Sequence, residues 1–195
     1  MSTRAARIAL AVYLLAIYAT LGVVRTITNF LRDRGLLRGS VVAAFVIAVA
    51  AILWLLFRDP RRRSWPYVLT LGVTACVYAA VIYPMQSPEE KIHFIEYGGV
   101  AVLAYASAPR HWAGTKQFVA CALFVAAAGW IDEGIQALLP SRVYDLRDVA
   151  FNAAAGLMAL AAIAIFSRHE RAAVGTDRPE ELAQDSVHGG SLGDG

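Results

Sequence analysis

The stretch SVVAAFVIAVAAILWLLF, residues 40–57, contains no charged side chain, and Ser40 is its only polar residue. A helix needs roughly 20 mostly apolar residues, within a range of about 17–25, to cross the hydrocarbon layer of a membrane. The stretch therefore predicts a membrane-spanning helix, because only helices satisfy all of their own backbone groups in lipid at such a length. Outward along the chain, segments of similar character predict six spans in all, at residues 6–24, 40–57, 66–83, 92–108, 117–139 and 149–166.

The composition of the chain supports a membrane protein. Apolar residues make up 58% of the 195 residues and charged residues 17%, whereas soluble domains average about 45–50% and about 25%. The sequence thus predicts an all-α fold, a polytopic helical membrane bundle formed by residues 1–166. Residues 167–195 are polar and glycine-rich, and we expect a disordered tail there. The arginines lie between the apolar runs, which is typical of topogenic charge and argues against nucleic-acid binding.

Lysine and arginine residues in the connections predict the orientation of the bundle. Of the 18 Lys and Arg residues, 11 fall on the side of the N-terminus. We therefore expect both termini in the cytoplasm. The connection Arg25–Arg38 places four arginines on the opposite side, and it is either a short interfacial helix or a basic loop.

Polar and ionisable residues are concentrated in the last three expected spans. Such residues are costly in a spanning helix, by about 2.5–3.5 kcal/mol for a charge at the centre, and they persist where they are paired, hydrated or used. In an alternating topology, the start of the fourth span, the end of the fifth and the start of the sixth lie at the same membrane face. We therefore expect the following residues to meet at one depth: His93, Glu96, Asp132, Glu133, Gln136, Asp148 and Asn152.

Residue spacing within these spans indicates how the side chains are arranged. His93 and Glu96 lie three positions apart and share a helix face, and Gln136 shares a face with both Asp132 and Glu133. Arg142 follows the fifth span, and we expect it to fold back over the acids and to hold a phosphate or carboxylate. In the same connection, Asp145 is a candidate N-cap of the sixth helix.

Three blocks of sequence resemble a known family. HFIEYGG at 93–99, WIDEGIQALLPSR at 130–142 and DLRDVAFNAAAG at 145–156 are similar to the VanZ-like membrane proteins, over about residues 83–166. Their shared pattern is a His or Lys followed by Glu-Tyr, then Asp-Glu-x-x-Gln with a nearby Arg, then Asp-x-x-x-Asn with a following Gly. The resemblance implies a bacterial plasma-membrane protein, and named members lower susceptibility to teicoplanin-type lipoglycopeptide antibiotics.

The functional hypothesis is a site for an amphiphilic envelope substrate, either a lipid-linked precursor or a lipoglycopeptide. Carboxylates and imidazole supply acid–base pairs. The candidate catalytic residues are His93, Glu96, Asp132, Glu133 and Asp148, and the candidate substrate-binding residues are Tyr97, Gln136, Arg142 and Asn152. We expect no cofactor. A metal alternative takes His93, Glu96 and Asp132 as ligands, but a single histidine without an HExxH motif supports it weakly.

The same polar residues are also compatible with roles that involve no catalysis. They can be hydrogen-bonding contacts between helices, which average only about 0.6 kcal/mol in membranes. They can form a binding or transport site, or the protein can be a sensor or scaffold that acts through its tail. Three glycines, Gly98, Gly99 and Gly156, are expected to allow helices to approach closely.

Overall fold

The computed structural model describes the backbone of residues 2–85, 87–109, 111–139 and 144–188, and side chains up to residue 168 except those of residues 61 and 89. Within these ranges all regular structure is helical, which confirms the predicted all-α fold. The elements are α1 (Thr3–Asp33), α2 (Leu37–Phe57), the 3-10 turn η1 (Pro60–Arg63), α3 (Trp65–Ile82), α4 (Pro88–Ser107), α5 (Gly114–Ala137) and α6 (Leu146–His188).

Five of these helices are long and apolar enough to cross a membrane: α1, α2, α3, α5 and the Leu146–Arg168 part of α6. The prediction of a helical membrane bundle is therefore confirmed. The remaining expected span corresponds to α4, whose 20 residues give a length of about 30 Å, close to the thickness of the hydrocarbon layer. The charged residues Glu90, Lys91 and Glu96 distinguish α4 from the uncharged stretches of these five helices.

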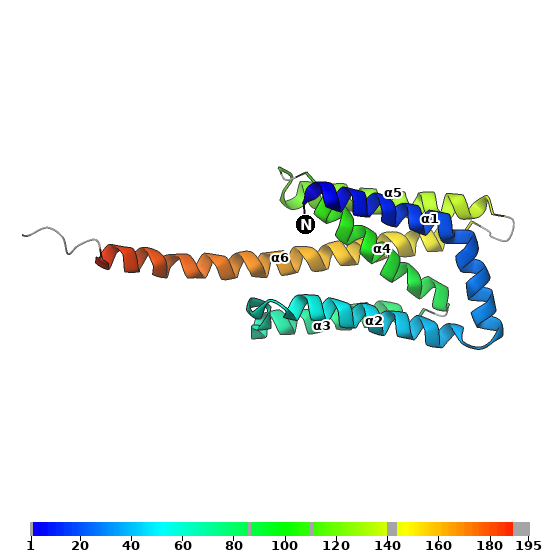
Figure 1. Cartoon of the computed structure of the whole chain (residues 1–195), viewed down its shortest axis with the longest axis horizontal. Coiled ribbons are helices and arrows are strands. Elements are labelled where there is room, and N and C mark those ends of the chain that lie inside the picture. The colour runs from blue at the N-terminus through cyan, green and yellow to red at the C-terminus, as the bar shows by residue number, and fades with distance from the viewer. Residues whose placement is uncertain (1, 86, 110, 140–143, 189–195) are drawn as a thin grey trace, which may run out of the picture.

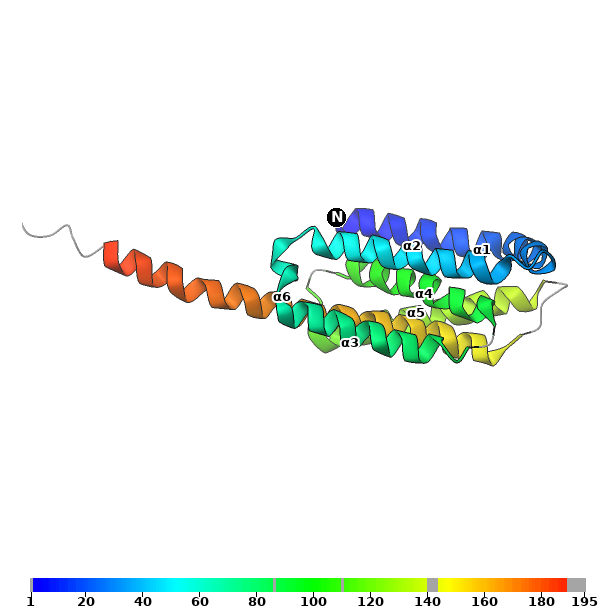
Figure 2. The ribbon, with the colours of Figure 1, turned by 90° about the horizontal axis from the view of Figure 1, so that it is seen from below.

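The position of α4 in the bundle explains how it tolerates this polarity. α4 packs against α1, α2, α5 and α6, and it runs between them in both ribbon views (Figures 1 and 2). Tyr97, Val100 and Ala101 of α4 have no exposed surface. The protein interior, and not lipid, therefore surrounds much of this helix.

The outer helices have the opposite character. In α2 only Leu37 and Val41 are buried by the protein, and side chains such as Val46 and Ile47 are more than 60% exposed. Such large uncovered apolar faces are unfavourable in water. They are the faces that we expect to contact lipid, so the predicted span at residues 40–57 matches a helix with a lipid-facing surface.

The helix ends that carry the polar residues lie together. The beginnings of α4 and α6 and the end of α5 are all at one end of the bundle, on the right in Figure 1. We call this the cluster end. The N-terminus of the chain lies at the other end, and α6 also leaves the bundle there (Figure 1).

α1 changes direction along its length. Its first part lies beside α4 and α5, whereas its last part turns and crosses the cluster end (Figures 1 and 2). Gly22 is the only glycine of the helix, and the hydroxyls of Thr20 and Thr26 donate to the carbonyls of Ala16 and Gly22, a bond that tends to bend helices. We call residues 23–33 the arm. The expected connection Arg25–Arg38 is neither a separate short helix nor a loop throughout: α1 continues to Asp33, a turn follows at residues 34–36, and α2 begins at Leu37.

α6 extends further than the sequence predicts. The expected domain boundary at Phe166 falls inside a continuous helix that reaches His188, and this helix projects beyond the bundle in Figure 1. The structure thus differs from the predicted disordered tail over residues 167–188, and residues 189–195 lie outside the described part of the chain. Residues 168–174, RHERAAV, contain several good helix formers, and extending an existing helix costs much less than starting a new one.

Candidate functional site

Apart from Ser107 at the far end of α4, the buried polar residues of α4, α5 and α6 lie toward the cluster end. Each of them has at most 8% of its surface exposed. We define the polar cluster as these buried residues: His93, Tyr97, Asp132, Glu133, Gln136 and Asn152. All six are candidate site residues of the sequence analysis, and all come from the three helices that it identified.

α5 contributes three members of the cluster through one face. Val125, Ala128 and Gly129 make this face apolar and small in the middle of the helix, and all three are buried. The same face becomes polar in the last turns, where Asp132 is 0% exposed and Glu133 is 1% exposed. Helical periodicity thus carries the acids of α5 into the protein interior rather than toward lipid.

Two tyrosine hydroxyls meet at the carbonyl of Ala128. The hydroxyl of Tyr18 in α1 donates to this oxygen at 2.8 Å, and the hydroxyl of Tyr97 in α4 donates to it at 3.4 Å. Both tyrosines also interact electrostatically with Asp132. Two helices, α1 and α4, therefore converge on α5 at Ala128.

Glu96 lies on the α1 side of the same region. Its Oε2 is 3.7 Å from Nδ1 of His93, as the spacing of these two residues predicts. The Glu96 side chain is 29% exposed and interacts electrostatically with Tyr13 of α1 and with Tyr97. Tyr97 thus interacts with two of the candidate acids, Glu96 and Asp132.

Close packing of α5 on α6 positions Asn152. A Cβ atom on Gly129 would lie 2.7 Å from Cβ of Asn152, and a Cβ atom on Gly156 would overlap Cγ1 of Val125. These two contacts pair residue 125 with 156 and residue 129 with 152, so α5 and α6 run antiparallel. One helical turn further toward the cluster end, the same pairing places Glu133 opposite Asp148. Asp148 itself lies in the first turn of α6 and is half-buried.

Three of the glycine expectations can be compared with these contacts. The close approach expected at Gly156 is confirmed, as is that at Gly99, where a Cβ atom would lie 2.7 Å from the Tyr13 hydroxyl. The expectation for Gly98 is wrong, because nothing lies within 4 Å of its Cβ position. Gly98 faces away from the helix that Gly99 contacts, and the pair GG alone does not indicate which of the two is at the contact.

The connection between α5 and α6 is attached to the cluster through Glu133. The backbone N–H of Asp145 donates to Oε1 of Glu133 at 2.7 Å. Asp145 in turn accepts from the N–H of Arg147 at 2.9 Å through its own Oδ1, which confirms its expected role at the start of the sixth helix. Arg142 lies outside the described residues, so its predicted place over the acids stays a prediction.

A different arginine lies at the edge of the site. Nη2 of Arg147 in α6 is 3.8 Å from Oε1 of Glu90 in α4. Because the Arg147 side chain is 71% exposed, this ion pair contributes little stability. The two residues join the first turns of α4 and α6 at the cluster end.

Two buried amides have polar atoms without partners. Within the part of the chain that the structure describes, Nε2 of Gln136 and both Oδ1 and Nδ2 of Asn152 are buried and make no hydrogen bond. A buried polar group left in this way costs about 1–3 kcal/mol. Such groups are usually satisfied by water or by a ligand, so these amides are suited to bind a polar group.

The cluster has the residue types of a proton-transfer or polar binding site. Among the described residues, no group of three or more His, Cys, Asp or Glu side chains is arranged to hold a metal ion. The metal alternative of the sequence analysis stays a prediction. Carboxylates, one imidazole and two amides remain as the chemistry that the described side chains offer.

Sequence analysis did not identify two of the residues around the cluster. Tyr13 and Tyr18 belong to α1, in a stretch that the sequence marks only as an apolar span. Their spacing of five positions follows no helical face, and only the packing of α1 on α4 and α5 shows that their hydroxyls reach polar partners.

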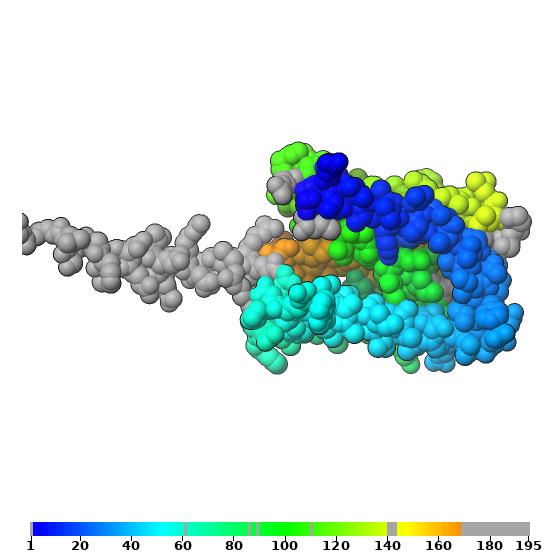
Figure 3. Space-filling view, viewed as in Figure 1, coloured from blue at the N-terminus to red at the C-terminus, as the bar shows by residue number. Residues whose placement is uncertain are grey.

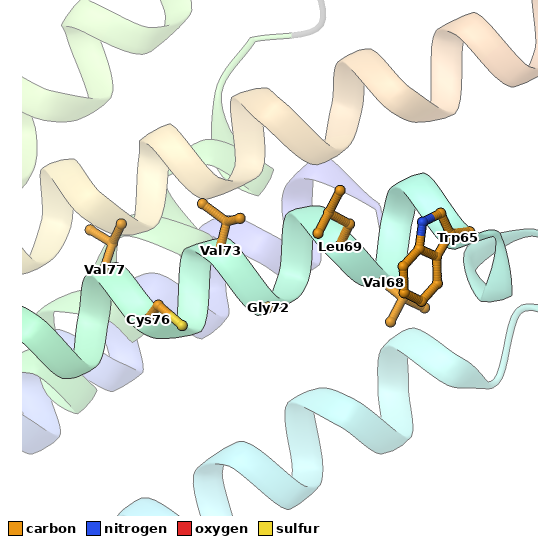
Figure 4. Close-up of a pocket in the computed structure, with 7 residues that line it drawn as sticks. All are labelled: Trp65, Val68, Leu69, Gly72, Val73, Cys76 and Val77. Carbon is orange, nitrogen blue, oxygen red and sulfur yellow. The ribbon is translucent and has the colours of Figure 1, made fainter.

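A groove elsewhere on the surface has a different character. It lies along α3 and is lined by apolar residues between Trp65 and Val77 (Figure 4). It contains no ionisable side chain apart from the Cys76 thiol. We regard this groove as part of the lipid-facing surface and not as a second polar site.

The fold and the site together define a class: a multi-pass helical membrane protein with a buried polar cluster at one end of its bundle. Comparisons of the chain with protein-family models, with curated proteins and with solved structures find no significant match.

Proposed function

We propose that this chain is a VanZ-like protein of a bacterial plasma membrane, in which the polar cluster binds or modifies an amphiphilic envelope substrate. The substrate class is a lipid-linked envelope precursor or a lipoglycopeptide, and the activity lowers susceptibility to teicoplanin-type antibiotics. The observation that carries this proposal is a pair of buried amides beside Asp132 and Glu133: Nε2 of Gln136 and both polar side-chain atoms of Asn152 make no hydrogen bond.

The composition of the cluster suits such a substrate. Carboxylates and imidazole in a water-poor site can accept and donate protons. The amides of Gln136 and Asn152 can bind carbonyl, hydroxyl or phosphate oxygens and their protons. His93 and Glu96 are a candidate acid and base on the same helix, and Nδ1 of His93 lies 3.7 Å from Oε2 of Glu96.

In this proposal a lipid approaches the cluster from the side of the bundle. Figure 3 shows a hollow between α1 and α2, with α4 visible at its floor. α4 is the helix that carries His93, Glu96 and Tyr97. In this proposal the acyl part of the substrate stays in the membrane and its polar part reaches the cluster end, on the outer face if both termini are cytoplasmic.

The test compares antibiotic susceptibility and lipid-precursor content in bacteria expressing the chain. Glu96→Gln, Asp132→Asn and Asp148→Asn each remove one charge while keeping the shape of the side chain. We expect each to abolish the change in susceptibility at equal protein abundance. Asp59→Asn is the matched control, because Asp59 lies in the connection between α2 and α3, outside the cluster. If all three cluster variants behave as the wild type, the proposal is wrong.

The alternative is a cluster that only stabilises the bundle. The hydrogen bond from Asp145 to Glu133 favours it, since this bond attaches a connection to a helix without any ligand. A structural cluster predicts that Asp132→Asn lowers the melting temperature of the purified protein and its abundance, with no separate loss of activity per molecule. A functional cluster predicts loss of activity with the melting temperature unchanged or raised.

A further inference from the structure

The arm carries an unusual density of positive charge for the end of a membrane bundle. Arg25 and Arg32 lie within it, Arg34 follows it directly, and Arg38 lies in the first turn of α2. Asp33 is the only acidic residue in this stretch. All four cations are arginines, whose guanidinium groups bind phosphate oxygens through paired hydrogen bonds.

The arm is also amphipathic. Val23, Ile27 and Phe30 follow one another by four and three positions and so form one stripe, and their side chains are 58%, 51% and 51% exposed. Arg25 and Arg32 lie on another face of the same helix. The protein thus leaves an apolar stripe uncovered, and the two arginines lie on the opposite side of the helix, the side that also carries the buried Thr28.

A defined turn holds the end of the arm in place. Gly35 has φ +68°, its N–H donates to the carbonyl of Arg32 at 2.9 Å, and the N–H of Leu36 donates to the carbonyl of Leu31 at 2.8 Å. This is the Schellman arrangement that ends a helix with a glycine. α2 begins two residues later, at Leu37, so Arg34 and Arg38 stay close to the arm.

The arginine after the arm is placed over its apolar stripe. The guanidinium carbon of Arg34 lies 4.2 Å from the centre of the Phe30 ring. A cation stacked on an aromatic ring in this way occupies the boundary between apolar and polar surroundings. The headgroup region of a membrane is such a boundary.

We propose that the arm lies in the membrane interface at the cluster end and binds the phosphate groups of anionic phospholipids. The stripe of Val23, Ile27 and Phe30 contacts the upper part of the acyl chains, as amphipathic helices in the interface do. Arg25 and Arg32 bind the lipid phosphates. The arm forms one end of the hollow between α1 and α2 in Figure 3, so a lipid held there extends its acyl chains along α4.

This proposal gives the four arginines a role other than setting topology. If both termini are cytoplasmic, these arginines lie on the outer side, whereas Lys and Arg are usually enriched in cytoplasmic connections. Binding to anionic headgroups accounts for positive charge at either face. The proposal rests on the membrane bundle and the course of α1, and it stands even if the polar cluster proves to be structural.

The test measures which lipid touches the arm. The full chain, with Cys76→Ala and Cys121→Ala, receives a single Ile27→Cys substitution and a fluorescent label at that position. It is reconstituted into vesicles of equal amounts of phosphatidylcholine and phosphatidylglycerol, with bromine atoms on the acyl chains of one lipid or of the other. We expect brominated phosphatidylglycerol to quench the label at least twice as strongly as brominated phosphatidylcholine.

Removal of the arginines should abolish this difference. In Arg25→Gln/Arg32→Gln the two brominated lipids should quench equally, whereas the matched control Arg58→Gln/Arg62→Gln, in the connection between α2 and α3, should keep the preference. With all arginines present, high salt should weaken the preference for brominated phosphatidylglycerol. This measurement needs no arginine substitution, so it does not depend on how the variants fold.

Three outcomes would overturn the proposal. The first is equal quenching by both lipids with all arginines present. The second is a preference that persists without Arg25 and Arg32. The third is a label at position 27 that neither lipid quenches, which would mean that water or another protein covers the stripe.

Discussion

Gly129 is the residue that allows Asn152 to reach the polar cluster. A Cβ atom there would lie 2.7 Å from Cβ of Asn152 on the facing helix, where no flexible side-chain end can give way. We expect Gly129→Ala to lower the free energy of unfolding by about 1–3 kcal/mol, as overpacking of a core does. Gly134→Ala on the same helix is the control, because nothing lies within 4 Å of its Cβ position. Thermal denaturation in detergent measures both, and equal melting temperatures would contradict the packing described for Gly129.

The Tyr18 hydroxyl makes a second prediction at this scale. Tyr18→Phe removes the 2.8 Å hydrogen bond to the Ala128 carbonyl and nothing else of the side chain. The expected loss is about 0.5–1.5 kcal/mol, the usual net value of one hydrogen bond. Tyr83→Phe is the matched control, since Tyr83 is 88% exposed. If both variants unfold at the same temperature, the hydroxyl contributes nothing at Ala128.

At the scale of the element, the turn after the arm can be tested separately from the arm itself. Gly35 has a positive φ that an alanine adopts only with strain, whereas Gly39 lies inside α2 and has open space around it. We expect Gly35→Ala to cost roughly 1 kcal/mol of stability and Gly39→Ala to cost nothing. Melting temperatures of the two variants decide the matter. A more stable Gly35→Ala protein would mean that the Schellman turn does not hold the arm.

Sequence reasoning succeeded for the elements whose physics is local. A helix that crosses lipid needs an uninterrupted apolar run, so α2 and α3 are visible in the sequence almost to the residue. The inner face of α5 follows from the spacing of Asp132, Glu133 and Gln136 alone. The extent of α1 beyond Val24 and of α6 beyond Phe166 was not predicted. In α1 the helix continues through polar sequence, and in α6 it continues through Gly175 and Pro179, residues that usually indicate a helix end.

The missing parts of the site depend on contacts between elements. The hydroxyl of Tyr18 belongs to the site only because α1 packs beside α5, and Gly129 matters only because Asn152 faces it. No spacing rule within one helix can show either contact. The sequence did identify the polar and ionisable residues of the site, because such side chains are costly anywhere in a membrane-spanning helix.

For the whole molecule, the fold places both the N-terminus and the exit of α6 opposite the cluster end (Figure 1). With the charge bias of the connections, we expect both termini in the cytoplasm and the cluster end outside. Reporter fusions at the N-terminus and after residue 188 measure this. An N-terminal reporter that is active only outside the cytoplasm would place the cluster end on the inner face and contradict action on an external substrate.

The central claim is that the polar cluster is kept for function at a cost to stability. Asn152→Leu tests it most directly, since leucine has nearly the same shape and removes the two polar atoms that lack partners. The variant is measured in two ways: the melting temperature of the purified protein, and the antibiotic susceptibility of cells that express it at wild-type abundance. We predict a protein stabilised by about 1–3 kcal/mol that no longer changes susceptibility. A variant that still changes susceptibility as the wild type does would contradict the account.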